Sequence, residues 1–395
     1  MSGKILNHIK SRSAELLQKV IEYRHHLHRN PELSFHEEET STWICNVLDS
    51  HGIPYTTGWA GYGVVGEISG KDSNKVVALR ADMDALPITE ENEKPYRSEK
   101  EGVMHACGHD VHMASLLGTA IILNEMKEEL PHSIRLIFQP GEEKLPGGAS
   151  VMIGEGVLRN PEPVCILGQH VYPVMEAGRT GVRAGLYMAS ADELYITVKG
   201  KGGHAAAPQR CTDTILAASQ IVVNLQQVIC RMTDPIVNAV LTIGKFNSIG
   251  GATNVIPDEV SLEGTFRCMD ENWRQKAHTM ITDVAEKTAA VYGATCEVRI
   301  MHGYPSLVNN PALAQNVRQL MEQYLGEDRV EELPMKMSSE DFAFYSQVIP
   351  ACFYRLGTGN KAANITANVH TSTFDIDESA LETGMGMMAW LALNQ

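Results

Sequence analysis

The sequence predicts an α/β protein with a central, mainly parallel sheet and a second, inserted α+β domain. Three observations support this fold class. The chain has 395 residues, more than one hydrophobic core usually supports, so two domains are expected. Apolar, β-branched runs alternate with helical patterns through the first half, which is typical of a parallel sheet covered by helices. From about residue 187 the pattern changes to β-α-β-β-α-β, the order of a ferredoxin-like sandwich.

The elements of the first half follow from the spacing of its apolar residues. We expect, in chain order, helices at 11–29 and 37–51, strands at 63–68 and 76–81, a helix at 110–128 and a buried strand at 134–139. Polar residues follow several of these strands, and sites in parallel α/β sheets form at the carboxyl ends of the strands. A functional site is therefore expected at that edge of the sheet.

The second domain is predicted from the same kind of pattern. Its expected elements are a strand at 193–199, a helix at 211–231, strands at 236–244 and 259–268, a helix at 271–291 and a strand at 295–301. Helix-and-strand alternation then resumes. We therefore place an inserted domain at 187–302 and a larger domain on its two flanks, 1–186 and 303–395.

The composition is that of an ordinary soluble globular protein, with 44% hydrophobic and 21% charged residues. A net charge of −15 argues against a nucleic-acid surface, since phosphate contacts need clustered Lys and Arg. No apolar run approaches the roughly 18 to 20 residues that a membrane helix needs. The start is amphipathic, with no apolar signal-peptide core. The eight cysteines are scattered, so we expect reduced thiols and a cytoplasmic protein.

Residues 105–112 read His-Ala-Cys-Gly-His-Asp-Val-His, a dense group of potential metal ligands. Imidazole, thiolate and carboxylate side chains ligate zinc, manganese, cobalt and nickel. Cys107 and His109 are two positions apart, so a turn or an extended segment can direct both at one point. The cluster therefore predicts part of a transition-metal site.

Glu142 and Glu143 follow a predicted strand and a glycine. Adjacent side chains diverge, so one carboxylate can ligate a metal while its neighbour faces the attacking water. A metal hydrolase needs this pair, because a free carboxylate takes the proton of the water and returns it to the leaving amine. A solvated charge pair in a loop is the ordinary alternative.

Other polar residues have weaker individual signals. His170 follows the apolar run VCILG, and His370 lies in ANVHTSTFDID; such a histidine, taken singly, is more often a hydrogen-bonded structural residue than a ligand. Asp82 and Asp84 end the strand at 76–81, and strand alternation directs both to the same side. One of them could orient a ligating histidine, or they could simply begin a turn before Pro87.

The inserted domain carries three further candidates. His204 lies in the glycine-rich stretch GKGGHAAAP and could donate to a developing oxyanion, although an incidental loop histidine is the alternative. Asn254 and Arg267 lie beside apolar strand patterns, and a substrate carboxylate would favour such an arginine. The histidines without ligand spacing are His25, His26, His28, His36, His51 and His132.

Taken together, the motifs resemble one family in their order. They read RADMDALP, MHACGHDVHMA, QPGEE, GQHV, GKGGHAAAP, GATNVIPD, GTFR, SSEDF and HTSTFDID, and they span nearly the whole chain. In this combination the chain resembles the M20 metallopeptidase family, specifically its amidohydrolase branch. That branch includes hippurate hydrolases, N-acyl-amino-acid and N-acetyl-diaminopimelate deacylases, and plant auxin-conjugate hydrolases.

The resemblance implies a zinc-peptidase-like catalytic domain with an inserted lid and dimerisation domain. It implies two divalent metal ions (Zn, Mn, Co or Ni), with Cys107 bridging them. The implied metal ligands are Cys107, His109, Glu143, His170 and His370. Glu142 matches the general acid/base of the family.

Four other positions match the family less directly. Asp84 matches the aspartate of the wider family's His-x-Asp motif, which tunes a metal ligand. His204 matches the histidine that reaches the active site of a neighbouring subunit, which implies a homodimer. Asn254 and Arg267 resemble substrate-binding positions, and Gly359 is expected to bind carboxylate through its backbone.

The chain also departs from the wider family at two positions. Asp82 stands where that family has a histidine ligand, and Cys107 stands where it has an aspartate. Both changes are usual within the amidohydrolase branch. A thiolate favours softer ions than a carboxylate does, so the identity of the metal is left open.

The resulting hypothesis is metal-dependent hydrolysis of the amide bond of N-acyl amino acids, such as N-acetyl or N-benzoyl derivatives. The products are a carboxylate and a free amino acid. A dipeptidase or carboxypeptidase with the same site is the nearer alternative. Two others are a cysteine hydrolase with Cys107 as nucleophile and a metal- or peptide-binding protein without turnover. The paired Glu142 and Glu143 argue against the last, since binding alone needs only one of them.

Overall fold

The computed structural model describes residues 2–395 and divides them into two compact units. The small unit comprises Met188–Leu307 and Met335–Glu340, and the large unit comprises the rest of the described chain. The small unit differs from the inserted segment expected at 187–302, because it adds residues 303–307 and 335–340. The added segment 335–340 is held by long-range hydrogen bonds: the Ala189 amide donates to the carbonyl oxygens of Lys336 and Ser338 at 3.1 and 3.2 Å.

The large unit is built on an 8-stranded mixed sheet with the order β1-β2-β4-β3-β5-β16-β6-β15. Its strands are β1 (Tyr55–Trp59), β2 (Gly63–Ile68), β3 (Asp72–Asp82), β4 (His132–Gln139), β5 (Cys165–Glu176), β6 (Thr180–Val182), β15 (Val330–Glu332) and β16 (Ala351–Gly359). Strands β4, β3, β5 and β16 run parallel to one another, whereas β1, β2 and β4 pair antiparallel in succession. At the other end of the sheet β6 is antiparallel to β16 and parallel to β15. The expected α/β class is confirmed, with a parallel centre and antiparallel flanks.

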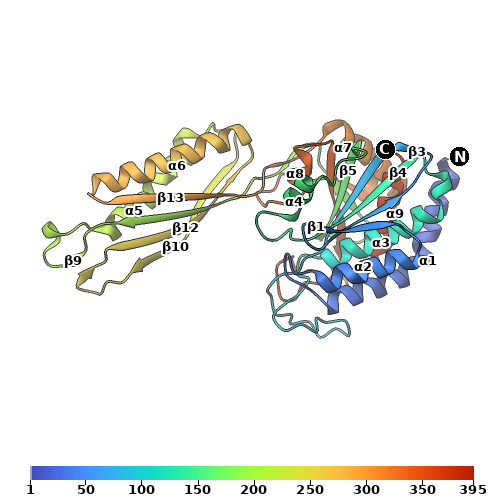
Figure 1. Ribbon diagram of the computed structural model, residues 1–395, viewed down its shortest axis with the longest axis horizontal. Coiled ribbons are helices and arrows are strands. Elements are labelled where there is room, and N and C mark those ends of the chain that lie inside the picture. The colour runs from blue at the N-terminus through green and yellow to red at the C-terminus, as the bar shows by residue number, and fades with distance from the viewer. Residues whose placement is uncertain (1) are drawn as a thin grey trace. The chain divides into compact units, whose positions relative to one another are not determined.

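Helices cover this sheet (Figure 1). They are α1 (Ser2–Arg29), α2 (Glu38–Ser50), α3 (His109–Glu125), α4 (Gly148–Glu155), α7 (Pro311–Leu325), α8 (Ala343–Ser346) and α9 (Ala380–Leu393). Helix α3 is buried along its whole length from His109 to Leu123, and α9 is buried almost completely. A helix that is apolar on every side belongs in a core, and α3 packs against both α1 and α9. The two short strands β7 (Gly185–Met188) and β14 (Leu307–Asn309) pair separately.

The small unit is a ferredoxin-like sandwich. Its elements are β8 (Asp192–Lys199), α5 (Thr214–Gln227), β10 (Ala239–Ile249), β12 (Glu259–Cys268), α6 (Glu271–Val291) and β13 (Thr295–His302). The sheet order is β10-β12-β8-β13, fully antiparallel, and α5 and α6 lie side by side on one face of it (Figure 1). Asp213 and Asp270 cap the two helices by accepting backbone N–H groups in their first turns. The expected β-α-β-β-α-β order is confirmed.

One expectation about this unit was wrong. The helical stretch Thr214–Met232, formed by α5 and a π-helical turn, is long and apolar enough by length and composition to cross a membrane, with a mean hydropathy of 1.2. Its polar residues before Arg231 are all uncharged, which is why the stretch passes this test. Ala217, Ile221 and Leu225 of the stretch pack into the core of the small unit, and 28% of it is buried.

Candidate metal centre

Two overlapping groups of potential ligands lie in the large unit. The ligand atoms of Cys107, His109 and His170 lie within 4.8 Å of one another, and so do those of Cys107, Glu143 and His370. These side chains come from the start of α3, the turn after β4, strand β5 and the segment after β16. Cys107 belongs to both groups, which is the position that a bridging ligand requires.

Hydrogen bonds orient two of the histidines in this centre. His109 directs Nδ1 at the backbone oxygen of Asp84, 2.8 Å away, and His170 directs Nδ1 at the backbone oxygen of Val171, also 2.8 Å away. A carbonyl oxygen can only accept, so each Nδ1 carries a proton and Nε2 is the nitrogen that is left for the centre. The His170 Nε2 lies 3.5 Å from Cys107 Sγ. Both rings therefore present Nε2, the nitrogen that a metal ion would bind.

The charges around the centre favour a bound cation. Burial lowers the pKa of His109, but the carboxylates of Asp82, Asp84 and Glu143 outweigh it and raise that pKa to about 10. Burial and the nearby carboxylates raise the pKa of the Cys107 thiol well above its ordinary value. The buried His109 Nε2 has no hydrogen-bond partner among the described residues. These donors therefore fit divalent metal ions, which would replace protons at sulfur and nitrogen.

Glu142 lies beside this centre and is almost fully buried. Its carboxylate belongs with His109 and Glu143 to a third group of ligand atoms within 4.8 Å. The Asp341 amide donates to Glu142 Oε1 at 3.3 Å. Glu142 is thus held next to the candidate ligands by a residue about 200 positions away in the chain, and this location suits a proton carrier.

Asp84 contacts two of the candidate ligands. Its Oδ2 accepts the Glu143 amide at 2.8 Å, and its Oδ1 lies 3.3 Å from His109 Nδ1. Asp84 therefore contacts the backbone of one candidate ligand and the ring of another. This arrangement is what a carboxylate that orients ligands requires.

His112 is a residue whose role the sequence left unassigned. The Val171 amide donates to His112 Nε2 at 2.9 Å, so Nδ1 carries the proton and donates to Asp82 Oδ1 at 2.6 Å. Arg80 also binds Asp82, on its other oxygen. Asp82 is thus neutralised by protein donors, and His112 joins it to the strand that carries His170. No local spacing signals this role, because the partners lie 30 and 59 positions away.

Asp110, in the second position of α3, lies in a buried ion network. Its Oδ2 accepts from Arg24 Nε at 3.0 Å and from His28 Nδ1 at 2.8 Å. Arg24 also binds Asp375 at 2.8 Å, in the segment that follows His370. Asp110 therefore ties the start of α3 to α1, and Gly108, not Asp110, occupies the N-cap position.

Two candidates of the small unit, His204 and Asn254, lie at a short pair of strands, whereas Arg267 lies near the end of β12. His204 in β9 (Gly203–His204) pairs with Val255 in β11 (Val255–Ile256), and the Ala205 amide donates to the backbone oxygen of Asn254 at 3.0 Å. His204 Nδ1 accepts the Ala206 amide at 3.0 Å, so its exposed ring presents Nε2–H as a donor. His204 and Asn254 are thus neighbours, and this pairing was not predicted.

Arg267 and Gly359 complete the candidate set. Arg267 donates from Nη1 to Ser339 Oγ at 2.9 Å, within the small unit. Gly359 ends β16 in the large unit, and a Cβ there would lie 2.1 Å from the backbone oxygen of Pro173. Only glycine fits this close approach between backbones.

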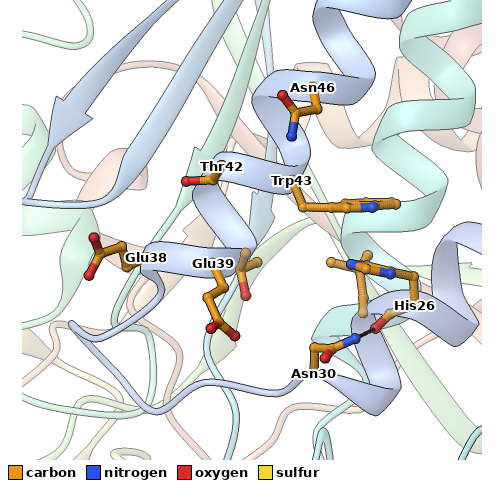
Figure 2. Close-up of a pocket in the computed structure, with 9 residues that line it drawn as sticks. His26, Asn30, Glu38, Glu39, Thr42, Trp43 and Asn46 are labelled. Atoms are coloured by element: carbon orange, nitrogen blue, oxygen red, sulfur yellow. Dashed lines mark hydrogen bonds between the residues drawn. The ribbon is translucent and has the colours of Figure 1, made fainter.

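A separate pocket of about 600 Å³ opens between the end of α1 and the start of α2 (Figure 2). The rings of His26 and Trp43 stack in it with centroids 4.6 Å apart. Glu38, Glu39 and neighbouring polar residues form its rim. None of the candidate metal ligands lines it, so it is not the centre described above.

Known proteins resemble this chain along its whole length. N-acetylcysteine deacetylase of Bacillus subtilis is 40% identical over 378 residues, which cover 95% of this chain and 96% of that protein. Thermostable carboxypeptidase 2 of Saccharolobus solfataricus is 38% identical over 392 residues, 98% of each chain. The crystal structure of the Bacillus subtilis YXEP protein, described as a dinuclear metal binding peptidase from the M20 family, matches with a TM-score of 0.83 and 36% identity, over 96% of this chain and 98% of that one.

A family model confirms the relationship. The model described as Peptidase family M20/M25/M40 matches residues 78–394. Together with the dinuclear relative, this match supports two divalent metal ions in the centre. The chain belongs to peptidase family M20/M25/M40 and is a hydrolase of amide bonds.

Proposed function

We propose that this protein hydrolyses the amide bond of N-acyl amino acids, releasing a carboxylate and a free amino acid. The observation that carries the proposal is the position of Cys107 in two ligand groups with Glu142 beside them. A relative named N-acetylcysteine deacetylase supports the N-acyl substrate class. The preferred acyl group and amino acid depend on the shape of the pocket.

Five residues would hold the two metal ions: Cys107, His109, Glu143, His170 and His370. When bound, the ions would acidify a water molecule and polarise the acyl carbonyl. Glu142, held by the Asp341 amide, takes the proton of the attacking water and returns it to the departing amine. Asp84 keeps His109 in the tautomer that presents Nε2 to the centre.

Residues of the small unit are proposed to bind the substrate. His204 would donate Nε2–H to the developing oxyanion, since its Nδ1 already accepts a backbone amide. Arg267 is proposed to bind the substrate carboxylate. Asn254 of the small unit and the backbone of Gly359 in the large unit are proposed as further substrate contacts. A lid role for the small unit follows from this assignment, because closure would exclude bulk water.

A homodimer through the small unit is part of the proposal. Strand β10 is an edge of the small sheet, and large apolar side chains on this unit are exposed. They include Val223 at 62%, Ile236 at 87% and Ile249 at 54%. An unpaired strand edge and exposed apolar side chains are features that another chain can cover. A cytoplasmic location remains a prediction that rests on the eight cysteines, which are all unpaired.

The deciding experiment measures amine release from a panel of N-acyl amino acids and matched dipeptides with metal-loaded protein. We expect higher kcat/KM for N-acyl amino acids. Faster turnover of dipeptides would instead favour the peptidase alternative, for which the relative named thermostable carboxypeptidase 2 is the precedent. Release of no amine from any member would refute the proposal. The Glu142→Gln variant measures the background.

The cysteine-hydrolase alternative is less consistent with the chemistry of the site. A nucleophilic cysteine needs a thiolate, and burial with nearby carboxylates raises the pKa of Cys107 instead. The histidine that contacts its sulfur, His170, has a pKa lowered well below the ordinary value by burial and by Arg355, so it is a poor base. A bound metal removes both difficulties, because it stabilises the thiolate and uses the neutral imidazole.

A further inference from the structure

The segment between α1 and α2 lies against the turn that carries Glu142 and Glu143. We call this segment, residues 30–37, the α1–α2 connector. The Ala85 amide, just beyond the end of β3, donates to the backbone oxygen of Glu32 at 2.7 Å. The Glu32 carboxylate also accepts a backbone amide at the start of α2 at 2.8 Å. The connector is thus attached both to the end of a central strand and to the following helix.

Glu37 of the connector holds the first residue of the turn. Its Oε1 accepts the Gly141 amide at 2.8 Å, and its side chain is fully buried. The Phe35 ring covers the same glycine so closely that a Cβ on Gly141 would lie 2.4 Å from Phe35 Cζ. Gly141 adopts a left-handed conformation with φ of 64°, which glycine tolerates. The position of Gly141 is therefore set by the connector on two sides.

Ser34 of the connector holds the other end of the turn through Asp84. Ser34 Oγ donates to Asp84 Oδ2 at 2.6 Å, and the same oxygen accepts the Glu143 amide at 2.8 Å. Since Gly141 and Glu143 are both tied, the backbone of Glu142 between them has little freedom. The directions of the proton carrier and of the adjacent ligand depend on this arrangement.

The connector shows two unfavourable features that a plain helix connection does not require. Phe35 has φ of 65°, a conformation that is uncommon for residues other than glycine. Glu37 is a buried carboxylate whose Oε2 has no hydrogen-bond partner among the described residues. Burial and the Asp84 carboxylate raise the pKa of Glu37 to about 7. Strain of this kind clusters at functional sites, where the surrounding structure maintains it.

We propose that the α1–α2 connector is a positioning element of the active site, in which the Glu37 side chain, by accepting the Gly141 amide, sets the directions of Glu142 and Glu143. Glu37 acts through the turn and is a positioning residue, not a catalytic one. The measurement of kcat depends on the proposed function. The measurement of zinc affinity depends only on the metal centre.

The test compares Glu37→Gln with Glu37→Leu. Glutamine keeps an oxygen acceptor for the Gly141 amide at the same length, whereas leucine has a similar volume and no acceptor. We expect Glu37→Leu to lower kcat about 10- to 100-fold with little change in KM, and to weaken metal affinity within a similar range. Glu37→Gln should retain both within about threefold, because the hydrogen bond is kept.

A matched control removes the same type of bond elsewhere in the large unit. The Glu155 carboxylate, at the last residue of α4, accepts the Ala60 amide at 2.7 Å and makes no hydrogen bond to the turn, so Glu155→Leu should leave kcat and metal affinity unchanged. Wild-type kcat in Glu37→Leu would overturn the proposal. Equal losses in Glu37→Gln and Glu37→Leu would overturn it too, since the acceptor would then not be what matters.

A second variant and a measurement of zinc affinity apply if Glu37→Leu does not fold or if no activity is found. If Glu37→Leu does not fold, Ser34→Ala takes its place, because it loses only the hydroxyl that binds Asp84. A severalfold loss of kcat in that variant supports the proposal, and wild-type kcat overturns it. Zinc affinity is measured by chelator competition without substrate. If the wild type releases no amine from any N-acyl amino acid, the zinc affinities of the two Glu37 variants still decide the positioning role.

Discussion

Two clusters of histidine around a buried aspartate occur among the described residues, one in each unit. In the small unit, Asp192 lies with His278 and His302, and in the large unit Asp82 lies with His109 and His112. Both sets bring potential ligand atoms within 4.8 Å, so distance alone does not separate them. Their hydrogen bonds do.

Protein donors occupy both oxygens of the Asp192 carboxylate. Its two oxygens accept from Arg274 at 2.6 and 2.9 Å, from His278 at 2.7 Å and from the Gly303 amide at 3.1 Å. In the large unit, the buried His109 Nε2 has no hydrogen-bond partner among the described residues. A buried charge cluster whose polar atoms are all paired is structural, whereas one with converging unpaired atoms is a candidate ligand site.

Metal removal should give the largest difference between the two clusters. After complete removal by a chelator, we expect amide hydrolysis to fall to background and to return when Zn²⁺ or Mn²⁺ is added, because only the large-unit cluster depends on a bound cation. Metal content is measured by elemental analysis alongside amine release. Activity that survives in metal-free protein would favour Cys107 as a nucleophile.

Glu142→Gln tests which residue of the large unit moves the proton. The amide keeps the size of the side chain but cannot take a proton, so kcat should fall by about 10²- to 10⁴-fold. Metal content should stay close to that of the wild type, since Glu142 is not proposed as a ligand. The outcome against this assignment is near-normal turnover at full metal occupancy.

Asp192→Ala tests the small-unit cluster. Removing this carboxylate leaves the Arg274 Nε and the His278 ring, both buried, without the group that accepts from them, which should cost about 3–5 kcal/mol of unfolding free energy. Urea unfolding measures the loss, and metal content should not change. As a control, Glu271→Gln removes a charge from the 31% exposed partner of Arg274 and should cost less than about 1 kcal/mol. A small loss in Asp192→Ala would show that this cluster is not structural.

The pH dependence of stability gives the smallest expected effect. Burial would raise the pKa of Asp192, but hydrogen bonds from Arg274 and His278 outweigh it and lower that pKa to about 2. The stabilisation is therefore present above the unfolded pKa of about 3.9 and is lost as the pH falls through 2, amounting to about 2 kcal/mol. Urea unfolding at pH 2, 3 and 5 should show this loss in the wild type and not in Asp192→Asn. Parallel pH profiles for both proteins would contradict it.

Much of the fold was predictable because its signals are local. The apolar, β-branched residues of 63–68 and the pattern of 259–268 predict strands with the bounds that the structure has, and the spacing in 271–291 predicts α6 in the same way. The least accurate prediction concerns α5. Because uncharged polar residues interrupt its apolar residues, we did not expect a helical stretch with the length and composition of a membrane span. The spacing of apolar residues along a helix indicates which face is buried, but not what covers the other face.

The candidate site was predictable only in its residue types. The resemblance to a family named the ligands, and the structure brings Cys107, His109, Glu143, His170 and His370 into overlapping groups. The parts that no spacing signals are the supports. His112 joins Asp82 to β5, and the α1–α2 connector holds the turn of Glu142 from more than 100 positions away.

By itself, the sequence determined the order of the elements, the two kinds of domain and the chemistry that the ligand candidates can perform. These depend on side-chain type and on the regular repeats of helix and strand, which a chain displays locally. Only the tertiary structure decided which nitrogen each histidine presents, which charged clusters are complete, and that residues 335–340 join the small unit. Those properties depend on partners that the fold brings together from distant parts of the chain, and a hydrogen bond forms only when its two atoms meet in space.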